Sequence, residues 1–507
     1  MTLSADDQKI LEKKGISEKV LNNQLETFEE GIPNIKVLDY AHIGKGIKQI
    51  DDEKLNLYSK TYEDSNLKVL KFVPASGAAT RMFKALHQFL NQVQIDEEAI
   101  EEALETEKFA LLKPLVHKIS QLAFYNQALD LTKKQVENFE NHTQTEQAVL
   151  VLKTALSEKG LNLANLPKGL ISFHDYGHKI LTPFDEHLEE AKSYAVKNKQ
   201  THLHFTISEQ HEENFNTALD HYLKTDNTEG IDFKVNFSYQ KPSTDTIAVN
   251  MDNTPFRDEN GHLFFRPGGH GALIYNLNDI DADLIFIKNI DNVSKKEQDK
   301  QDTTIYKKVL GGLLIHLQNQ IFDYQKALEN KPTDDLIEEV KAFMTDSLLI
   351  KEPAETPNDL IDQLHKPIRI CGMVKNDGAP GGGPFWIENK SGDQSLQIVE
   401  TSQMNLKDKT QKQILDNATH FNPVDIVCGV KDYKGEKFDL LKYVNPKRGF
   451  VTQKSVAGKN IKALELPGLW NGAMEYWHSI FVEVPFSTFN PVKTVVDLVK
   501  PAHQEDL

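Results

Sequence analysis

The chain has 507 residues, enough for about two to four domains or for one large core domain with insertions. Its 58 basic and 75 acidic side chains give a net charge of −17, which argues against nucleic acid or an anionic membrane surface as the main partner. Charged residues make up 26% of the chain, and no apolar run is long enough for a membrane span. We therefore expect a soluble globular protein.

Cysteine usage and the N-terminus bear on location. Only Cys371 and Cys428 are present, far apart in the sequence, so neither a disulfide framework nor a cysteine metal site is expected. The first residues lack the apolar core of a secretion signal, so we expect a cytoplasmic protein. The oligomeric state stays open.

Residues 4–31 have the apolar spacing of amphipathic helices, and residues 66–73 read as a strand. The strand runs into a loop of small residues, 74–80, which would expose backbone N–H groups to an anion. Arg81 follows and could grip a phosphate through two parallel hydrogen bonds. A tight connection that merely lets a helix pack closely is the alternative reading.

Residues 83–160 are rich in Ala, Leu, Glu and Lys and predict a helical insertion over one side of the sheet. The loop Pro167-Lys168-Gly169 then presents one lysine beside a glycine. His174, Asp175 and His178 invite a metal interpretation, which we rank low because nothing nearby supplies further ligands.

The next strands end on polar groups. Residues 202–208 form a His-x-His strand, and residues 235–240 end on Gln240, which can donate and accept as reading a nucleobase edge requires. Residues 263–292 then predict strand, glycine turn, helix and strand. That strand delivers Asp291 to the carboxyl edge of a sheet, where open α/β folds bind ligands.

Residues 294–365 return to a helical pattern, and short strands then alternate with loops. The glycine run at 378–386 predicts a long turn or flexible flap. One strand ends on Glu400, a plausible acceptor for sugar hydroxyls. The strands expected in this part lie at 368–374, 395–402, 424–430, 449–454 and 480–484.

Taken in order, these motifs resemble those of the UDP-sugar pyrophosphorylase superfamily, most closely its UDP-N-acetylhexosamine pyrophosphorylase branch, as a bacterial offshoot. The family's loop Ala-Gly-Gly-x-Gly-Thr-Arg-Leu is similar to Ala75-Ser76-Gly77-Ala78-Ala79-Thr80-Arg81-Met82, although Ser76 and Ala79 replace glycines. The later motifs keep the family order: Pro167-Lys168-Gly169, Gln240, Pro267-Gly268-Gly269-His270-Gly271, Asp291-Asn292, Val399-Glu400-Thr401 and Pro491-Val492-Lys493-Thr494.

The resemblance implies an α/β fold of the nucleotide-diphospho-sugar transferase type (GT-A, Rossmann-like), a mixed sheet flanked by helices. We accordingly expect a helical segment at 1–65, a catalytic domain at 66–499 with helical insertions at 83–160 and 294–365, and a tail at 500–507. The implied reaction transfers a nucleotidyl group from an NTP, with UTP favoured, to a sugar 1-phosphate and releases pyrophosphate.

The resemblance also implies a role for each motif. Arg81 would hold the β- and γ-phosphates, Lys168 the α-phosphate and Lys493 the sugar phosphate, with Mg²⁺ on Asp291. The loop at 75–80 would cradle the triphosphate. The remaining assignments are a pyrimidine read by Gln240, Gly268, Gly269, His270 and Gly271, and a sugar bound by Glu400 and Asn292.

Other classes of function remain as alternatives. The two replaced glycines favour a nucleotide or nucleotide-sugar binding protein without turnover. A glycosyltransferase would want Asp-x-Asp at the end of a strand, whereas Asp281-Ala-Asp283 begins one. A hydrolase built on His174, Asp175 and His178 ranks last.

Overall fold

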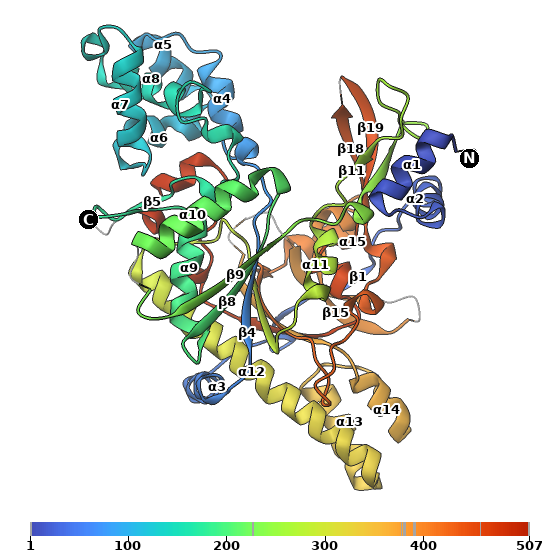
Figure 1. Cartoon of the computed structure of the whole chain (residues 1–507). Helices are drawn as coiled ribbons and strands as arrows, with labels where there is room; N and C mark the ends of the chain where they lie inside the picture. Colours follow the sequence, from blue (N-terminus) through green and yellow to red (C-terminus); the bar gives the residue numbers. More distant parts are fainter. Residues whose placement is uncertain are drawn as a thin grey trace. The chain divides into compact units, whose positions relative to one another are not determined.

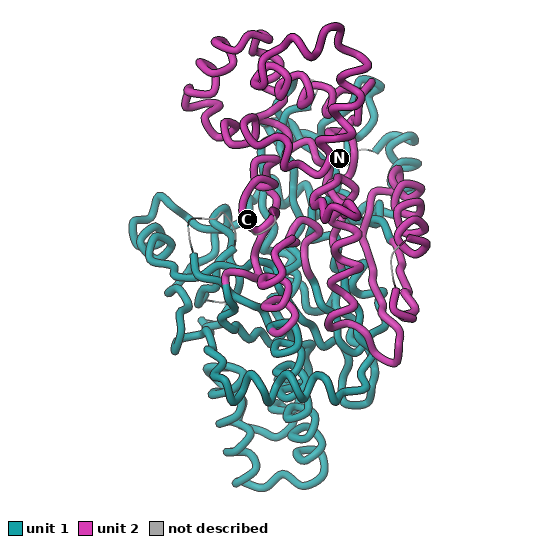
Figure 2. The backbone as a smooth tube through the Cα atoms, turned by 90° about the vertical axis from the view of Figure 1, so that its left-hand side faces the viewer, with its two compact units in different colours: residues 1–72, 238–287, 306–485 teal, residues 73–237, 288–305, 486–507 magenta. Residues whose placement is uncertain are grey.

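The computed structural model describes residues 3–225, 228–376, 378, 382–388, 392–456 and 458–504. The chain divides into two compact units, drawn in teal and magenta in Figure 2. Unit 1 consists of residues 1–72, 238–287 and 306–485, and unit 2 of residues 73–237, 288–305 and 486–507. Each unit is therefore assembled from segments that lie far apart in the sequence.

Unit 1 is built on a mixed sheet with helices packed against it. Parallel pairs join β4 to β12, β13 to β20, and β20 to β3, whereas β13 and β17 are antiparallel. Its strands lie in the order β2 (His42–Ile43), β3 (Gly46–Lys48), β20 (His478–Glu483), β13 (Ile368–Lys375), β17 (Asp425–Gly429), β12 (Leu284–Lys288) and β4 (Val69–Pro74). The predicted α/β architecture is confirmed.

The apolar run in β12 explains its central place. Leu284, Ile285, Phe286 and Ile287 have no exposed surface, as expected for a strand covered on both faces. Helix α3 (Asp52–Asp64) packs against this strand, with the Tyr62 and Phe286 ring centroids 5.9 Å apart.

Glycines let α3 lie close to the long helix α12 (Glu297–Asn330), and both are labelled in Figure 1. A Cβ atom on Gly312 would lie 1.8 Å from the carbonyl oxygen of Tyr58, a distance no side chain tolerates. Glycine weakens a helix interior, so its presence in α12 is explained by the close approach of α3.

Two smaller sheets complete unit 1. One has the order β1 (Val37–Tyr40), β14 (Gly382–Glu388) and β15 (Gln394–Glu400), and the other β11 (Phe265–Arg266), β10 (Thr246–Val249), β19 (Lys459–Glu465) and β18 (Phe450–Val456). The N-terminal helices α1 (Ala5–Lys14) and α2 (Glu18–Glu30) bury Leu11, Leu21 and Phe28 in one apolar cluster with Ile247 and Val249 of β10. The amphipathic pattern of 4–31 therefore serves packing.

Unit 2 contains a helical group and a set of paired strands. Residues 83–160 hold α4 (Lys84–Leu90), α5 (Glu97–Glu105), α6 (Lys113–His117), α7 (Tyr125–Gln135) and α8 (Gln144–Leu156). Their shared core also takes in Val492, Val495 and Leu498, so the end of the chain packs into this group.

Strand β8 (Gln200–Thr206) pairs with β7 (Val196–Lys197) and with β9 (Asp232–Ser238). Helices α9 (Pro183–Tyr194) and α10 (Glu212–Thr225) pack on these strands through Phe184, Phe205, Phe215 and Phe237. Among the described residues, no helix has the length and apolar character needed to cross a bilayer.

Two expectations about local structure need correction. The segment 1–65 is not only helical, because it also contributes β1, β2 and β3. The glycine run at 378–386 is not all flap, since Gly382 and Gly383 pair with Glu400 and Val399 in an antiparallel ladder; residues 377 and 379–381 lie outside the described residues. A Cβ atom on Gly382 would lie 2.8 Å from Ile398, so glycine is needed there for packing.

Candidate active site

A carboxylate contacted by two lysines forms the centre of the candidate site in unit 2. Asp291 follows β12 and is 6% exposed. The Lys168 Nζ lies 3.0 Å from its Oδ2, and the Lys493 Nζ lies 3.0 Å from Oδ2 and 3.3 Å from Oδ1. Two lysines that lie far apart in the sequence thus contact the same oxygen atom of Asp291.

Contacts between its backbone and the small-residue loop at 74–80 fix the position of Lys168. The strand-like pairing of Ala78 with Pro167 brings the small-residue loop against this segment, and the Lys168 N–H donates to the Gly77 carbonyl at 3.1 Å. A Cβ atom on Gly169 would lie 3.2 Å from Ile290, so glycine allows this turn to pack against the segment that leads to Asp291. The Lys168 ammonium also donates to the Val492 carbonyl at 2.8 Å.

Lys493 is positioned by the side chain of Asn292. The Asn292 Nδ2 donates to the Thr488 carbonyl at 3.2 Å, and its Oδ1 accepts the Asn490 N–H at 2.8 Å. The Val492 N–H donates to the Asp291 carbonyl at 3.0 Å, which places Lys493 beside that carboxylate. Asn292, expected to bind sugar, therefore already uses both ends of its amide to hold the loop.

The charge of Asp291 depends on its two partners. Burial opposes ionisation, yet the charges of Lys493 and Lys168 hold the pKa of Asp291 below its ordinary value. The Lys168 side chain is only 14% exposed whereas that of Lys493 is 55% exposed, so Lys493 is the ammonium more open to a ligand. The site therefore presents two cations around a single anion.

Arg81 does not join this cluster. It ends the short 3-10 helix η1 (Ala79–Arg81), its side chain is exposed, and in the part of the chain that the structure describes it makes no hydrogen bond or ion pair. The following helix α4 has seven residues, so its dipole adds little to anion binding at this loop.

The small-residue loop leaves several groups accessible. Ser76, Gly77, Ala78 and Thr80 are exposed, and a Cβ atom on Gly77 would meet nothing within 4 Å. Ala79 is buried, and its N–H donates to the Leu166 carbonyl at 3.3 Å. Ala79, one of the two residues that replace a glycine of the family loop, therefore faces the protein interior, whereas Ser76, the other, lies at the surface.

The expected base residues and Glu400 lie in unit 1, whereas Asn292 belongs to unit 2. His270 stacks on Trp470 with ring centroids 4.2 Å apart, and its Nδ1 accepts the Leu469 N–H at 3.1 Å. Its Nε2 lies 3.7 Å from Glu400 Oε1, which also accepts the Asn471 amide at 3.1 Å. Burial opposes ionisation of Glu400, but these contacts hold its pKa below the ordinary value.

Gln240, Thr401 and Thr494, the remaining residues of the predicted motifs, have different surroundings. The Gln240 Nε2 lies 3.5 Å from Asp245 Oδ1, at the limit of a hydrogen bond, so this amide is loosely held. Thr401 begins the short helix η10 (Thr401–Gln403). Thr494 forms a reciprocal cap with Asp497 and so helps to fix the backbone after Lys493.

The glycine turn at 268–271 is explained largely by packing against another backbone. A Cβ atom on Gly268 would lie 2.5 Å from the Thr244 carbonyl oxygen, and one on Gly271 would lie 2.2 Å from the Pro467 carbonyl oxygen. Gly269 adopts φ +79°, a left-handed conformation that favours glycine. The turn is thus required by the fold of unit 1 whether or not a base binds there.

We expect Gly271→Ala to lower the free energy of unfolding by about 1–3 kcal/mol, because the added methyl overlaps the Pro467 carbonyl. Gly77→Ala is the matched control and should change it by no more than about 0.5 kcal/mol, since open space surrounds that position. Urea unfolding of both variants measures the difference. Equal stabilities would contradict the packing explanation.

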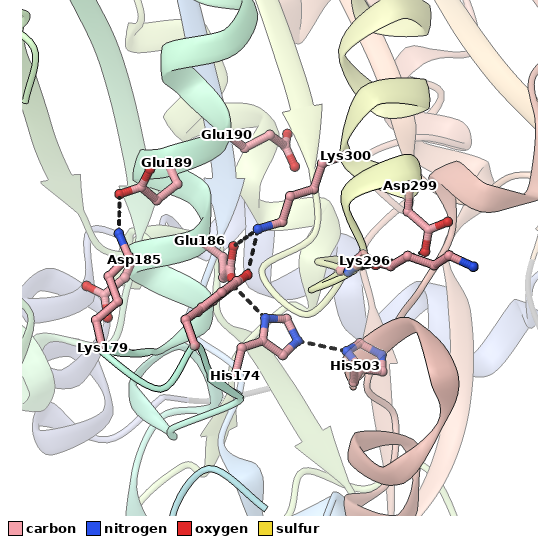
Figure 3. Close-up of polar contacts among 12 residues, drawn as sticks. His174, Lys179, Asp185, Glu186, Glu189, Glu190, Lys296, Asp299, Lys300 and His503 are labelled. Atoms are coloured by element: carbon pink, nitrogen blue, oxygen red, sulfur yellow. Dashed lines mark hydrogen bonds and ion pairs between the residues drawn. The ribbon is translucent and has the colours of Figure 1, made fainter. Parts of the chain in front are cut away.

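His174 belongs to a buried network, drawn in Figure 3, and not to a metal site with His178. Its Nδ1 lies 2.6 Å from Glu186 Oε1 and its Nε2 lies 2.9 Å from His503 Nδ1. His178 is exposed and contacts the Tyr176 carbonyl instead, and Asp175 caps the Gly177 N–H. The three residues therefore do not converge, which removes the basis of the hydrolase alternative.

Lys300 completes this network. Its Nζ donates to the Tyr176 hydroxyl at 2.6 Å and lies 3.4 Å from Glu186 Oε2. Sequence reasoning missed His503 and Lys300, because contacts among residues 174, 186, 300 and 503 leave no local pattern in the sequence.

We expect His503 to make folding stability fall in mild acid. Burial and the neighbouring His174 lower the pKa of His503 from 6.5 to about 3, so between these values only the unfolded chain binds the proton. Relative to His503→Gln, the wild type should lose about 2 kcal/mol between about pH 6.5 and pH 5. Urea unfolding at both pH values provides the measurement. Parallel pH profiles would show that His503 is not the titrating group.

Asp291 fits Mg²⁺ as a single-carboxylate ligand. Over the residues that the structure describes, no group of three or more His, Cys, Asp or Glu side chains forms a metal site. Mg²⁺ at nucleotide sites is commonly held by one or two carboxylates together with phosphates and water, so one carboxylate is sufficient. Oδ1 is the less engaged oxygen, because only Lys493 contacts it, at 3.3 Å.

Fold and site together define an α/β protein whose second unit carries a lysine–aspartate–lysine cluster beside a loop of small residues. The family model described as "Domain of unknown function (DUF4301)" matches residues 4–504, and the chain belongs to that family. A comparison with curated proteins finds no match.

Solved structures of sugar pyrophosphorylases are similar at low identity. The UDP-N-acetylglucosamine pyrophosphorylase of Trypanosoma brucei is 11% identical with a TM-score of 0.49, over 98% of this chain and 79% of that one. The UDP-glucose pyrophosphorylase of Leishmania major is 14% identical with a TM-score of 0.44, over 98% and 79%.

Proposed function

We propose that the protein is a nucleotidyltransferase that transfers a nucleotidyl group from an NTP to a sugar 1-phosphate and releases pyrophosphate. The observation that carries the proposal is the contact of Lys168 and Lys493 with the same oxygen of Asp291. Such a reaction brings two polyanions together, so two cations held side by side are what it requires.

Each lysine is assigned one phosphate. A phosphate oxygen of the sugar 1-phosphate attacks the α-phosphorus, a new P–O bond forms, and the bond to the β-phosphate oxygen breaks as pyrophosphate leaves. Lys168 contacts the α-phosphate and Lys493 the attacking sugar phosphate, so the two lysines align the reactants and offset their charge. No covalent enzyme intermediate is needed.

Asp291 has two roles in this proposal. Without a substrate, its carboxylate keeps the two ammonium groups together despite their mutual repulsion. With substrate bound, Asp291 would hold Mg²⁺, which neutralises charge on the phosphate oxygens. The more exposed Lys493 is the one we expect to turn from Asp291 toward a phosphate.

The remaining assignments follow the motif order. Exposed Arg81 and the loop at 75–80 would contact the β- and γ-phosphates, helped by the N–H groups of residues 76–78, for which the described residues provide no acceptor. Gln240 and the turn at 268–271 would contact a pyrimidine, so UTP is the favoured nucleotide. Glu400, held ionised by its neighbours, would accept hydrogen bonds from sugar hydroxyls.

The identity of the sugar 1-phosphate and the location of the protein in the cell are also part of this proposal. An N-acetylhexosamine 1-phosphate is the first substrate to test, because the motifs resemble that branch of the superfamily most closely. The cytoplasmic location remains a prediction.

The test is a panel assay. Purified protein is incubated with Mg²⁺, one NTP and one sugar 1-phosphate at a time, and inorganic pyrophosphate is measured by a coupled enzyme reaction. Nucleotidyl transfer predicts release that needs both substrates and is highest with UTP. Release without a sugar phosphate would instead indicate hydrolysis of the NTP.

A binding protein without turnover is the second candidate, favoured by the burial of Ala79 and the use of its N–H inside the protein. It predicts a higher melting temperature with nucleotide but no pyrophosphate from any substrate pair. The two candidates are therefore separated by the same panel with a thermal shift measurement beside it.

A further inference from the structure

A pocket lies wholly within unit 1 and holds none of the residues assigned above. Its volume is about 320 Å³, and it lies between the segment that follows α2 and the start of β18. The wall comes from Phe28, residues 31–35, 402–403 and 447–451, Gln453 and Lys462. A pocket of this size accommodates a small metabolite.

The charge of this pocket is opposite to that of the protein. Lys447, Arg448 and Lys462 line it, and none of the described residues that line it is acidic, although the whole chain carries a net charge of −17. Three cations that remain together without a lining carboxylate favour an anionic ligand, and a doubly charged group such as a phosphate fits best.

The three cations of the pocket differ in whether a carboxylate contacts them. Arg448 is neutralised by Glu475, with Nε 2.6 Å from Oε2 and NH2 3.0 Å from Oε1. Lys462 donates to the uncharged amide oxygen of Asn253 at 2.8 Å, and Lys447 has no hydrogen bond or ion pair through its ammonium among the described residues. Neither lysine forms an ion pair in the part of the chain that the structure describes, although hydrogen bonds from Thr254 and the charge of Lys462 lower the pKa of the nearby Asp252.

The rest of the wall combines apolar and polar side chains. Phe28, Ile32, Pro33, Phe450 and Val451 supply carbon surface, and Asn34, Ser402, Gln403 and Gln453 supply polar groups. An inorganic ion would leave this surface in contact with water, whereas an organic group attached to the anion would cover it.

We infer that this pocket binds a phosphorylated organic molecule, with its phosphate on Lys447 and Lys462 and its apolar or aromatic part against Phe28 and Phe450. The site is separate from the Lys168–Asp291–Lys493 cluster, which lies in unit 2.

Gln403 connects the pocket with Glu400. Its Nε2 donates to the Arg448 carbonyl at 2.9 Å, and its Oε1 accepts the Glu400 N–H at 3.0 Å. A ligand that moves the 447–449 segment would therefore also shift the position of Glu400 through Gln403. Under the proposed function, on which this step alone rests, the ligand would act as an effector of sugar binding.

Binding is tested with phenyl phosphate, inorganic phosphate and phenol as probes, by titration calorimetry of the full chain at low salt. We expect phenyl phosphate to bind most tightly of the three. Lys447→Met with Lys462→Met should weaken it by about tenfold or more, because two charge-assisted contacts are lost. The control is Lys459→Met, which removes an exposed lysine that lies on β19 with Lys462 but outside the pocket. This variant should bind phenyl phosphate as the wild type does.

Acetylation of lysines followed by peptide mass spectrometry locates the bound probe. Phenyl phosphate should protect Lys447 and Lys462 but leave Lys459 reactive. Binding that the double variant retains at wild-type affinity, equal affinity for inorganic phosphate and phenyl phosphate, or no saturable binding would each overturn the inference. All of these readouts are independent of pyrophosphate release.

Discussion

Lys168→Ala is expected to lower the rate of pyrophosphate release by about 10²–10³, the usual cost of losing one preorganised charge contact in a transition state. The Lys168 ammonium is largely buried and held by both Asp291 and the Val492 carbonyl, so no other cation can move into its place without rearranging the loop. Lys493→Ala should cost a similar factor. Steady-state pyrophosphate release measures both.

The control for these variants is Lys84→Ala, which removes an exposed lysine from α4 in the same unit. It should leave the rate unchanged. The double variant Lys168→Ala/Lys493→Ala should lose less than the product of the two single losses, because the two lysines act together on neighbouring phosphates. A wild-type rate in either single variant would remove that lysine from the mechanism.

Asp291→Ala is expected to lower the free energy of unfolding by about 3–5 kcal/mol, the cost of leaving a buried charge without its partner. The charge in question is that of Lys168, whose side chain is 14% exposed. Lys493 is half exposed, so water can solvate its ammonium once the carboxylate is gone. Urea unfolding without nucleotide measures the loss.

A second substitution separates charge from packing. In Asp291→Ala, adding Lys168→Met removes the unpaired cation and keeps the length of the side chain, so much of the lost stability should return. If the double variant is no more stable than Asp291→Ala, the loss comes from packing and not from charge. In the wild type, the contribution of Asp291 should be full above the unfolded carboxyl pKa and decline in acid, because the folded pKa is lowered.

Much of the sheet could be predicted from the sequence. The apolar run at 284–287 is strand β12, because a central strand that is buried on both faces shows continuous apolar residues. The predicted strand at 66–73 is β4, in which Lys71 is buried together with Val69, Leu70 and Phe72. β14 escaped prediction, since Gly382, Gly383 and Pro384 are turn-forming residues by composition and become a strand only through pairing with β15.

The candidate site could be predicted in part. The order of the motifs indicated that Lys168, Asp291 and Lys493 belong together, and each of them lies within two residues of Gly, Pro or Asn in a short local pattern. The role of Asn292 in holding Thr488 and Asn490 could not be foreseen, because it depends on backbone groups almost two hundred positions away. The isolation of Arg81 likewise depends on tertiary structure.

One measurement tests nucleotidyl transfer most directly: ³¹P NMR of UTP and N-acetylhexosamine 1-phosphate with the protein and Mg²⁺. Nucleotidyl transfer predicts that the signals of a UDP-sugar and of pyrophosphate rise in equal amounts, and that Lys168→Ala shows neither over the same period. UTP and sugar phosphate signals that stay unchanged with the wild-type protein, for this sugar and for the rest of the panel, would contradict it.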